Sequence, residues 1–353
     1  MKNFKPNILL AITALSLILA SCHKSQPVNL VTGPVASGVY VLNQGLFNAN
    51  NSTLSFYDNT SQNVTTDVFT AANGRGLGDT GNDVEIYGSK MYIVVNVSST
   101  IEVVDSRNAK SIKQIKLFNG ATARQPRDIA FYKNNAFVTS YDGTVTVIDT
   151  VTLTVSQFIT VGRNPEQLAV SNGKLYVANS GGLSYPNFDK TVSVIDLTSL
   201  TVIKTLTVIV NPQGVVADTH GNVYVLSAGD YGATPSGLTI IDNVADVVKK
   251  TTNFDGSNMT IQGDNLYFTT SANKVIIYNA VSQSITNTNF ISDGTVVTTP
   301  YSLAADGVTG EVYVTDAKNY TANGTLFVFD KTGKKEYSTI VGVNPGKVAI
   351  LKK

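Results

Sequence analysis

The sequence has no tryptophan, one cysteine and two histidines among its 353 residues. A single cysteine cannot form a disulfide framework within the chain, and one cysteine with two histidines is too few for a zinc site made of these residue types. Charged residues make up only 14% of the chain, where about a quarter is usual, and 26 Lys plus Arg nearly equal 25 Asp plus Glu. This balance argues against a nucleic-acid partner, because binding to phosphates needs a basic surface.

In place of charge, the chain is rich in threonine, serine, asparagine and glycine, and 42% of its residues are hydrophobic. That mixture is typical of short strands joined by turns rather than of long solvated helices. The length fits either two domains or one large all-β domain.

The first 21 residues have the pattern of a secretory signal, in which a basic start precedes the apolar run Ile8–Ala20. The run is too short to span a bilayer comfortably. It ends in Leu19-Ala20-Ser21-Cys22, which resembles the bacterial lipobox, whose cysteine is lipidated and becomes the mature N-terminus. We therefore predict a signal peptide over 1–21, lipidation of Cys22, and a tether over 22–37. An ordinary signal peptide with an incidental cysteine is the alternative.

One unit recurs seven times after residue 38. Each unit contains an apolar strand with a central aromatic residue, and these aromatic residues lie 52, 45, 39, 48, 43 and 46 positions apart. They are Tyr40, Tyr92, Phe137, Tyr176, Tyr224, Tyr267 and Tyr313. A second strand that ends in Asp or Asn follows, then a Thr- and Val-rich strand, and a Pro or Gly turn opens the short apolar strand of the next unit. Four strands at this period are typical of a propeller blade.

Seven units predict an all-β fold, a seven-bladed β-propeller of four-stranded blades over residues 38–353. The first unit lacks its own opening strand, whereas the chain end, Asn344–Leu351, has the opening-strand pattern with nothing after it. We predict that this C-terminal strand pairs into blade one and closes the ring, which would leave no free inner edge. An open solenoid of β-units is the alternative.

The repeat resembles that of the YncE-like propellers over about residues 38–353. The resemblance is strongest in blade four, 163–208, which contains the segments NP, LAV, GKLYVAN and VSVID in that order. Lipoproteins of this type are typical of Bacteroidetes, and the BtuG-type surface lipoproteins are a similar branch. Those are seven-bladed propellers that capture cobalamin for an outer-membrane transporter.

This resemblance implies an outer-membrane lipoprotein at the cell surface that binds a corrinoid as its small-molecule ligand. Its repeat consists of core and turn residues, so no ligand-binding motif of that branch can be matched to positions here. Surface lipoproteins of the phylum tend to carry acidic residues just after the lipidated cysteine, and His23-Lys24-Ser25-Gln26 does not. The periplasm-facing leaflet therefore remains an alternative location.

Loop length distinguishes the two faces of the predicted ring. If strands A to D of each blade run from the axis outward, the B–C and D–A loops share one face and the A–B and C–D turns share the other. The A–B turns are tight, whereas four B–C loops are long: 43–51, 179–190, 227–237 and 316–324. Long loops on a rigid scaffold are where binding usually occurs.

The loops of this face carry aromatic, amide and guanidinium side chains. Such a surface suits a large, flat, partly polar ligand, because rings can cover its face while polar groups bond its rim. The candidate ligand-binding residues are Phe47, Arg75, Arg124, Arg127, Arg163, Asn179, Tyr185, Phe188, Tyr231, Tyr301 and Tyr320. A corrinoid with amide arms fits this surface, and so does a glycan. The alternative for each aromatic residue is that it only pins its own loop.

Catalytic residues are scarce. His220 lies in an A–B turn on the opposite face and His23 lies in the tether, so neither joins a Ser-His-Asp arrangement on the loop-rich face. The strand-ending Asp recurs in six blades, which predicts turn capping rather than catalysis. No loop has the regular oxygen-ligand spacing of a Ca²⁺ site, so we predict no metal site and no cofactor.

We therefore predict a monomeric, non-enzymatic lipoprotein that captures a corrinoid for uptake by an outer-membrane transporter and touches the membrane through its lipid alone. A propeller that docks on a protein or a glycan at the cell surface is the alternative. A propeller hydrolase or lactonase is a third possibility, and a pair or trio of acids around a metal at the axis would favour it.

Overall fold

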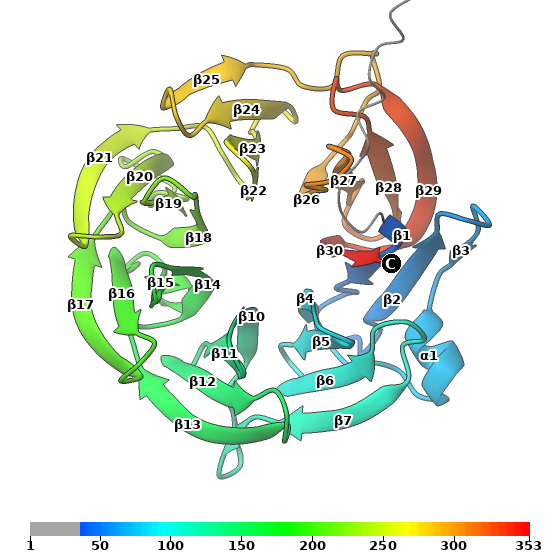
Figure 1. Ribbon diagram of the computed structural model, residues 1–353, viewed down its shortest axis with the longest axis horizontal. Helices are drawn as coiled ribbons and strands as arrows, with labels where there is room; N and C mark the ends of the chain where they lie inside the picture. The colour runs from blue at the N-terminus through cyan, green and yellow to red at the C-terminus, as the bar shows by residue number, and fades with distance from the viewer. Residues whose placement is uncertain (1–35) are drawn as a thin grey trace, which may run out of the picture. The chain divides into compact units, whose positions relative to one another are not determined.

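The computed structural model describes residues 36–353, which form seven four-stranded antiparallel sheets in a ring around a central axis (Figure 1). This confirms the predicted all-β, seven-bladed propeller. Within these residues, helix is confined to α1 (Val68–Asn73) and one 3-10 turn, η1 (Gly182–Ser184). Neither has the length and apolar character that a bilayer-spanning segment needs.

The strands of each blade, from the axis outward, are as follows. Blade one contains β30 (Pro345–Lys352), β1 (Ala36–Asn43), β2 (Thr53–Asp58) and β3 (Val64–Thr65); blade two contains β4 (Gly81–Tyr87), β5 (Lys90–Val95), β6 (Thr100–Asp105) and β7 (Ser111–Lys116); blade three contains β10 (Pro126–Tyr132), β11 (Asn135–Ser140), β12 (Thr144–Asp149) and β13 (Thr154–Thr160). Blade four contains β14 (Pro165–Ser171), β15 (Lys174–Asn179), β16 (Thr191–Asp196) and β17 (Thr201–Thr207); blade five contains β18 (Pro212–Ala217), β19 (Asn222–Ser227), β20 (Gly237–Asp242) and β21 (Val247–Asn253). Blade six contains β22 (Met259–Gln262), β23 (Asn265–Thr269), β24 (Val275–Asn279) and β25 (Ser284–Asn287); blade seven contains β26 (Pro300–Ala305), β27 (Val312–Asp316), β28 (Asn323–Phe329) and β29 (Lys335–Val343). A small hairpin of β8 (Phe118–Asn119) and β9 (Thr122–Ala123) lies between blades two and three.

The ring closes at blade one, as predicted. β30 is its innermost strand and pairs antiparallel with β1, so that Val39 faces Ile350 and Val41 faces Val348. The first and last strands of the described chain therefore lie side by side in one sheet (Figure 1). The predicted signal peptide over 1–21 and the lipidation of Cys22 lie outside the described residues. β1 begins at Ala36, so the last two residues of the predicted tether belong to the first strand.

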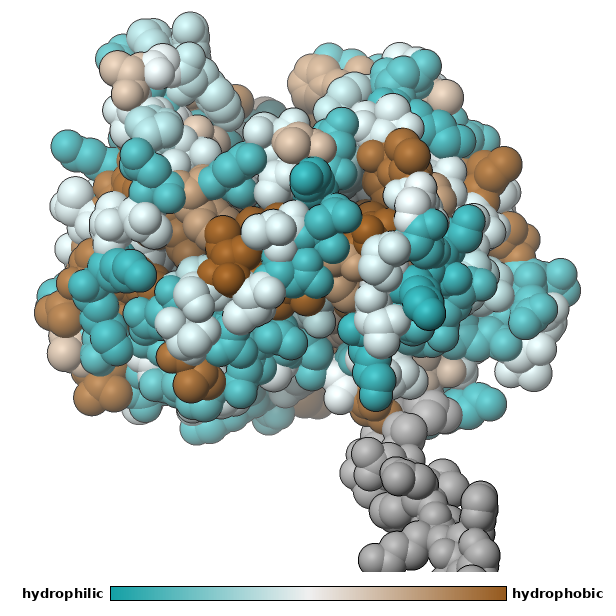
Figure 2. All heavy atoms as spheres, turned by 90° about the horizontal axis from the view of Figure 1, so that it is seen from above, coloured by the Kyte–Doolittle hydropathy of each residue, from teal (hydrophilic) through white to brown (hydrophobic). Residues whose placement is uncertain are grey.

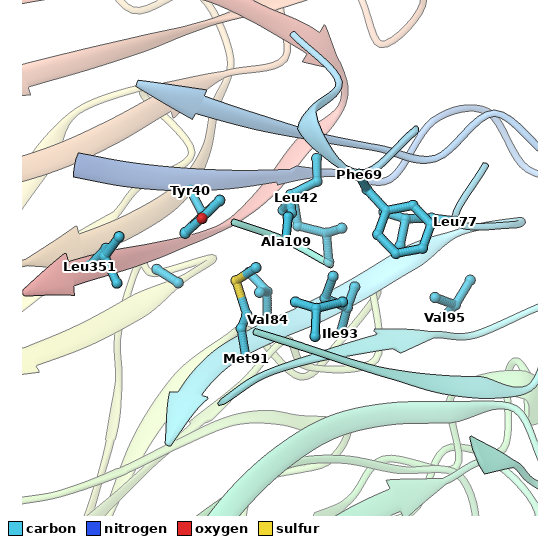
Figure 3. Close-up of a cluster of buried hydrophobic side chains, with 13 residues drawn as sticks. Tyr40, Leu42, Phe69, Leu77, Val84, Met91, Ile93, Val95, Ala109 and Leu351 are labelled. Carbon is cyan, nitrogen blue, oxygen red and sulfur yellow. The ribbon is translucent and has the colours of Figure 1, made fainter. Parts of the chain in front are cut away.

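The core lies between neighbouring blades, where the faces of their sheets meet. In Figure 3, Tyr40 and Leu42 of β1 point toward Val84 and Met91 of blade two, and Phe69 of α1 covers one end of the cluster. All of these side chains are buried. In every blade, the recurring aromatic residue belongs to the cluster that the blade forms with the next one.

Four of these buried tyrosines, Tyr40, Tyr176, Tyr224 and Tyr313, have a partner for their hydroxyl in a turn, whereas the hydroxyl of Tyr92 has none among the described residues. Tyr224 Oη donates to Asp218 Oδ2 at 2.9 Å, and Tyr313 Oη donates to Glu311 Oε2 at 2.7 Å. Burial and the adjacent carboxylates raise the pKa of both hydroxyls, which therefore stay protonated and act as donors. These bonds offset the cost of burying the hydroxyl at the positions that have them.

The strand-ending acids cap turns, as predicted. Asp196 accepts the backbone N–H groups of Thr198 at 3.1 Å and Ser199 at 2.7 Å. The bond from Ser199 is the main reason why the pKa of Asp196 is lowered, because hydrogen bonds to the ionised form favour that form. The same bonds to residues two to four positions ahead recur at Asp58, Asp149, Asp242, Asn279 and Asp330.

The faces of the ring differ as the loop lengths predict. The A–B and C–D turns form one face, called here the turn face, and the longer B–C and D–A connections form the loop-rich face. Figure 2 shows the ring from its side, with two groups of residues that project from the upper edge and a hollow between them. Apolar residues on that side are scattered among polar ones rather than joined in one belt.

Candidate functional site

The inner strands begin at the loop-rich face, and their first residues surround the axis. In six blades the second residue of the inner strand, and in blade six Ser257 just before β22, together form a mostly polar ring: Gly346, Asn82, Arg127, Glu166, Gln213, Ser257 and Tyr301. Strands β10 and β14 have an irregular register between their first and fourth residues, and such bulges re-aim side chains. These residues line a cavity of about 300 Å³ that we call the axial well, together with Gln44, Asp128, Gln167, Gly214, Asn258, Met259 and Lys347.

A paired arginine occupies one side of the axial well. Arg127 Nε donates to Glu166 Oε2 at 2.9 Å, and the guanidinium lies 4.6 Å from the centre of the Tyr141 ring. Tyr141 Oη donates to the other carboxylate oxygen of Glu166 at 2.7 Å, and Asn82 bonds both the guanidinium and the backbone carbonyl of Arg127. Burial lowers the pKa of Arg127, but Glu166, together with Tyr141 and Asp128, outweighs burial and raises the pKa, so the guanidinium is charged.

Carboxyl groups surround one lysine deeper in the channel. Lys347 Nζ of the closing strand β30 lies 2.8 Å from Asp83 Oδ1, 3.4 Å from Glu85 Oε1 and 4.0 Å from Asp128 Oδ2. The last two and Lys347 also line a second cavity of about 510 Å³, which continues the channel beyond the axial well. One ammonium thus joins blade one to blades two and three.

The charges at this depth are coupled. The pKa of Glu85 is raised to about 7, chiefly by burial and less strongly by Asp83, while Lys347 opposes the shift. Burial, Asp83 and Glu85 also raise the pKa of Asp128 well above its usual range. Burial alone would lower the pKa of Lys347, but the three carboxyl groups raise it, so the lysine is charged. Glu85 and Asp128 therefore hold a proton more strongly than exposed carboxyl groups would.

An exposed aromatic group lies on the loop-rich face beside the axial well. The rings of Tyr185 and Phe188 lie 5.8 Å apart, and those of Phe188 and Tyr231 lie 5.6 Å apart, all edge to face. Tyr185 is 71% and Tyr231 is 68% exposed. We call these three residues the aromatic shelf; they bridge the long loops of blades four and five. The sequence predicted each of them as a binding residue, and the structure shows that they contact one another.

The aromatic shelf and the axial well are connected. Tyr231 lines a cavity of about 260 Å³ together with Gln213 and Ser257, which also line the axial well. Tyr301 is a second aromatic residue at the well, where its hydroxyl donates to Gln44 Oε1 at 2.6 Å and its ring meets the ring of Tyr320 at 5.9 Å. Phe47 is 73% exposed in the loop after β1.

The other predicted arginines hold the framework. Arg163 contacts Asp189, donates to Ser184 Oγ at 3.1 Å and reaches the carbonyl oxygen of Asn187 at 3.1 Å, so it braces the loop that carries Tyr185. Arg124 pairs with Asp142 and lies 3.9 Å from the Phe158 ring centre.

Two further candidates lie away from the axial well and the aromatic shelf. Arg75 bonds Glu102 at 2.7 Å and lies 5.0 Å from the ring centre of Phe69, the α1 residue in the core cluster between blades one and two. Asn179 is completely buried, and its amide donates to Thr191 Oγ1 and Ser193 Oγ at 3.1 and 3.0 Å. This amide is therefore committed to blade four rather than offered to a ligand.

The sequence prediction included Arg127 and Tyr301 but missed most of the axial well. Asn82, Glu166, Gln213 and Lys347 also line the well and were not predicted. The available signal was that the second and third residues of inner strands are mostly polar, although the rest of each strand is apolar. No group of three or more His, Cys, Asp or Glu side chains within 36–353 has the arrangement of a metal site.

Comparison with known proteins establishes the family. The model of the family described as "Domain of unknown function (DUF5074)" matches residues 37–343, so this chain belongs to that family. None of the curated proteins matches the sequence.

Similar solved structures agree with the fold. They include hydrazine synthase of Kuenenia stuttgartiensis, with a TM-score of 0.64, 15% identity, and coverage of 76% of this chain and 89% of that one. A quinonprotein alcohol dehydrogenase-like protein of Bacteroides thetaiotaomicron has a TM-score of 0.66 and 18% identity, with coverage of 90% of this chain and 79% of that one. At these identities the likeness concerns the propeller fold alone.

Proposed function

We propose that this protein is a non-enzymatic binding propeller that captures a large, flat, partly polar ligand at its loop-rich face, and that a corrinoid is the first candidate. The observation that carries the proposal is the aromatic shelf, where two of three rings are more than two-thirds exposed beside a polar well. Exposed apolar groups collected at one place on a soluble surface commonly mark an interaction site. A corrinoid offers a flat ring system for the shelf and amide arms for the polar rim.

The shelf is suited to binding because its loops are already held. Arg163 ties the loop of blade four at Asp189, Ser184 and Asn187. In blade five, Asp230 accepts the backbone N–H of Gly232 at 2.8 Å and another from Thr234 at 2.9 Å. Loops that are ordered before binding lose little conformational entropy on binding, so more of the contact energy becomes affinity.

Lipid anchoring at Cys22 would present this face away from the membrane. β1 starts at the turn face, where the backbone N–H of Asn59, in the turn after β2, donates to the carbonyl oxygen of Ser37 at 3.1 Å. The residues between Cys22 and Ala36 can span at most about 50 Å. We propose a monomer at the outer membrane, most simply on the cell surface, that passes its ligand to an outer-membrane transporter.

The channel floor supports a binding role over a hydrolytic one. A hydrolase of the propeller type would need its acids arranged around a metal ion. Here the three carboxyl groups surround the ammonium of Lys347, which lies 2.8 Å from Asp83 in the place that a cation would take.

The test is a titration of the mature chain carrying Cys22→Ala, so that no lipid is attached, with cyanocobalamin and with cobinamide, followed by the corrinoid absorption spectrum. Tyr185→Ala and Tyr231→Ala should each weaken binding by roughly 1 to 4 kcal/mol, as expected for anchor residues. The matched control is Tyr87→Ala, a partly exposed tyrosine on the turn face, which should leave affinity unchanged. Absence of binding to both corrinoids would reject the corrinoid proposal.

A glycan is the second candidate, because aromatic rings also stack on sugars and the axial well is rich in amide side chains that can bond hydroxyl groups. If corrinoids do not bind, a glycan panel on the same variants distinguishes this case, since a glycan that uses the aromatic shelf should also lose affinity on Tyr185→Ala.

A further inference from the structure

We infer that the axial well is a second part of the ligand site, and that it takes a neutral hydrogen-bonding arm of the ligand, a carboxamide in the corrinoid case, in preference to a carboxylate. This inference rests on the proposed function, because it assumes a ligand whose flat part lies on the aromatic shelf. The shelf supplies contact area, and the well would supply selectivity.

The first step is continuity. The cavity beside Tyr231 shares Gln213 and Ser257 with the axial well, so the two cavities adjoin at these two residues. A ligand on the aromatic shelf can therefore extend an arm toward the axis. The axial well, at about 300 Å³, has room for a short polar chain together with water.

The second step is the hydrogen bonding of three amide side chains in the well. Each of them uses either its carbonyl oxygen or its N–H group in a bond within the protein. Gln44 accepts the Tyr301 hydroxyl at its carbonyl oxygen, which leaves its N–H donors for a ligand. Gln167 accepts the backbone N–H of Val215 at 3.2 Å and likewise keeps its donors. Gln213 instead spends its N–H on Asn211 at 3.3 Å and keeps its carbonyl acceptor. The well thus offers both donors and an acceptor, and a carboxamide has the matching acceptor and donors, whereas a carboxylate has acceptors only.

The third step is charge. The Arg127 guanidinium is compensated by Glu166, and Lys347 is compensated by Asp83, so the cations of the well are already paired. Asp128 also lines the well. Burial and nearby carboxyl groups raise its pKa, which means that further negative charge is disfavoured at that place. An anionic arm would meet carboxyl groups without a free cation.

The experiment compares cyanocobalamin with its monocarboxylic acids, in which one peripheral amide is hydrolysed, on the mature Cys22→Ala chain near neutral pH. We expect the amide ligand to bind about tenfold more tightly than the acid isomer whose altered arm enters the well. Gln213→Ala should reduce this preference, because it removes the acceptor that only an amide can satisfy. Gln157→Ala, on the outer strand β13, is the matched control and should preserve it.

A second variant should change the amide-to-acid preference in favour of the acid. Glu166→Gln removes the carboxylate that compensates Arg127 while keeping a similar shape, so the freed guanidinium should shift preference toward the acid ligand. If cyanocobalamin binds and Tyr185→Ala weakens it, but neither Gln213→Ala nor Glu166→Gln changes the amide-to-acid ratio, this inference is overturned and the proposed function stands. If no corrinoid binds, the corrinoid proposal fails and this inference fails with it.

Discussion

The two faces of the ring come from one repeat, yet their side chains are held in different ways. On the turn face, strand-ending acids bond backbone groups close ahead in sequence, as Asp196 does with Ser199. On the loop-rich face, Asp230 caps its own loop in the same way, but other acids bond distant segments. Asp79 accepts the backbone N–H of Asn48 and of Asn50, 31 and 29 positions away, both at 3.1 Å.

This difference separates scaffold from function. A turn that contains its own cap can be repeated in every blade without reference to the rest of the ring. A loop held by a remote partner can differ from blade to blade, and the aromatic shelf lies among such loops, with Arg163 reaching Asp189 across 26 positions. We therefore expect substitutions on the turn face to change stability and substitutions on the loop-rich face to change binding.

The largest effect is expected from a deletion that removes a strand supporting both faces. Deletion of residues 344–353 removes β30, with the buried Val348 and Leu351, and exposes the edge of β1. Loss of this apolar burial alone should cost roughly 5 kcal/mol, comparable with the whole stability of an ordinary domain. Circular dichroism should show no cooperative melting of the truncated chain. Deletion of Lys353 alone is the control, and an unchanged melting temperature after the full deletion would contradict closure by β30.

Arg163→Ala should have the next largest effect, and it tests one loop of the aromatic shelf by itself. Without its bonds to Ser184 and Asn187, the loop must be ordered by the ligand, so affinity should fall by about three- to tenfold. The melting temperature should hardly change, because the guanidinium is exposed and its ion pair with Asp189 is screened by solvent.

The control for this variant is Arg107→Ala, which removes an exposed arginine from a turn-face loop. It should change neither affinity nor melting temperature appreciably. Equal losses of affinity in both arginine variants would show that a charge effect, rather than bracing of the loop, is responsible.

A smaller effect concerns the channel between the faces. The folded-state pKa of Glu85 is about 7, above its ordinary 4.5, so the folded protein keeps a proton that the unfolded chain releases between those values. Stability should therefore decline as pH rises through this window. Glu85→Gln should remove the part of that decline that Glu85 causes, so its gain in melting temperature over wild type should be larger near pH 8 than near pH 5. A gain that does not vary with pH would contradict the raised pKa.

The sequence was informative where a feature repeats at one position of every blade. The buried aromatic of each blade, the capping acids and the closing strand could all be predicted, because each is one position in a period. The partners of the arginines could not. Arg127 meets Glu166 and Arg124 meets Asp142 over 39 and 18 positions, and nothing in either local segment indicates that its charge is already compensated. Most residues of the axial well could not be predicted for the same reason, because seven separate strands contribute to it.

The smallest expected effect returns to the turn face. His220 Nε2 lies 2.7 Å from Asp264 Oδ1, and this contact joins blades five and six at the face opposite the aromatic shelf. The hydrogen bond to Asp264 raises the pKa of His220 above its ordinary 6.5. The stabilisation is therefore fully present below the unfolded-state pKa and is lost as pH rises through the folded-state value. His220→Ala should lower the melting temperature slightly near pH 5.5 and leave it unchanged near pH 9, while ligand affinity stays at the wild-type value at both. Loss of binding in this variant, with Tyr185→Ala behaving as wild type, would mean that the ligand occupies the turn face, and the division between the two faces would have to be reversed.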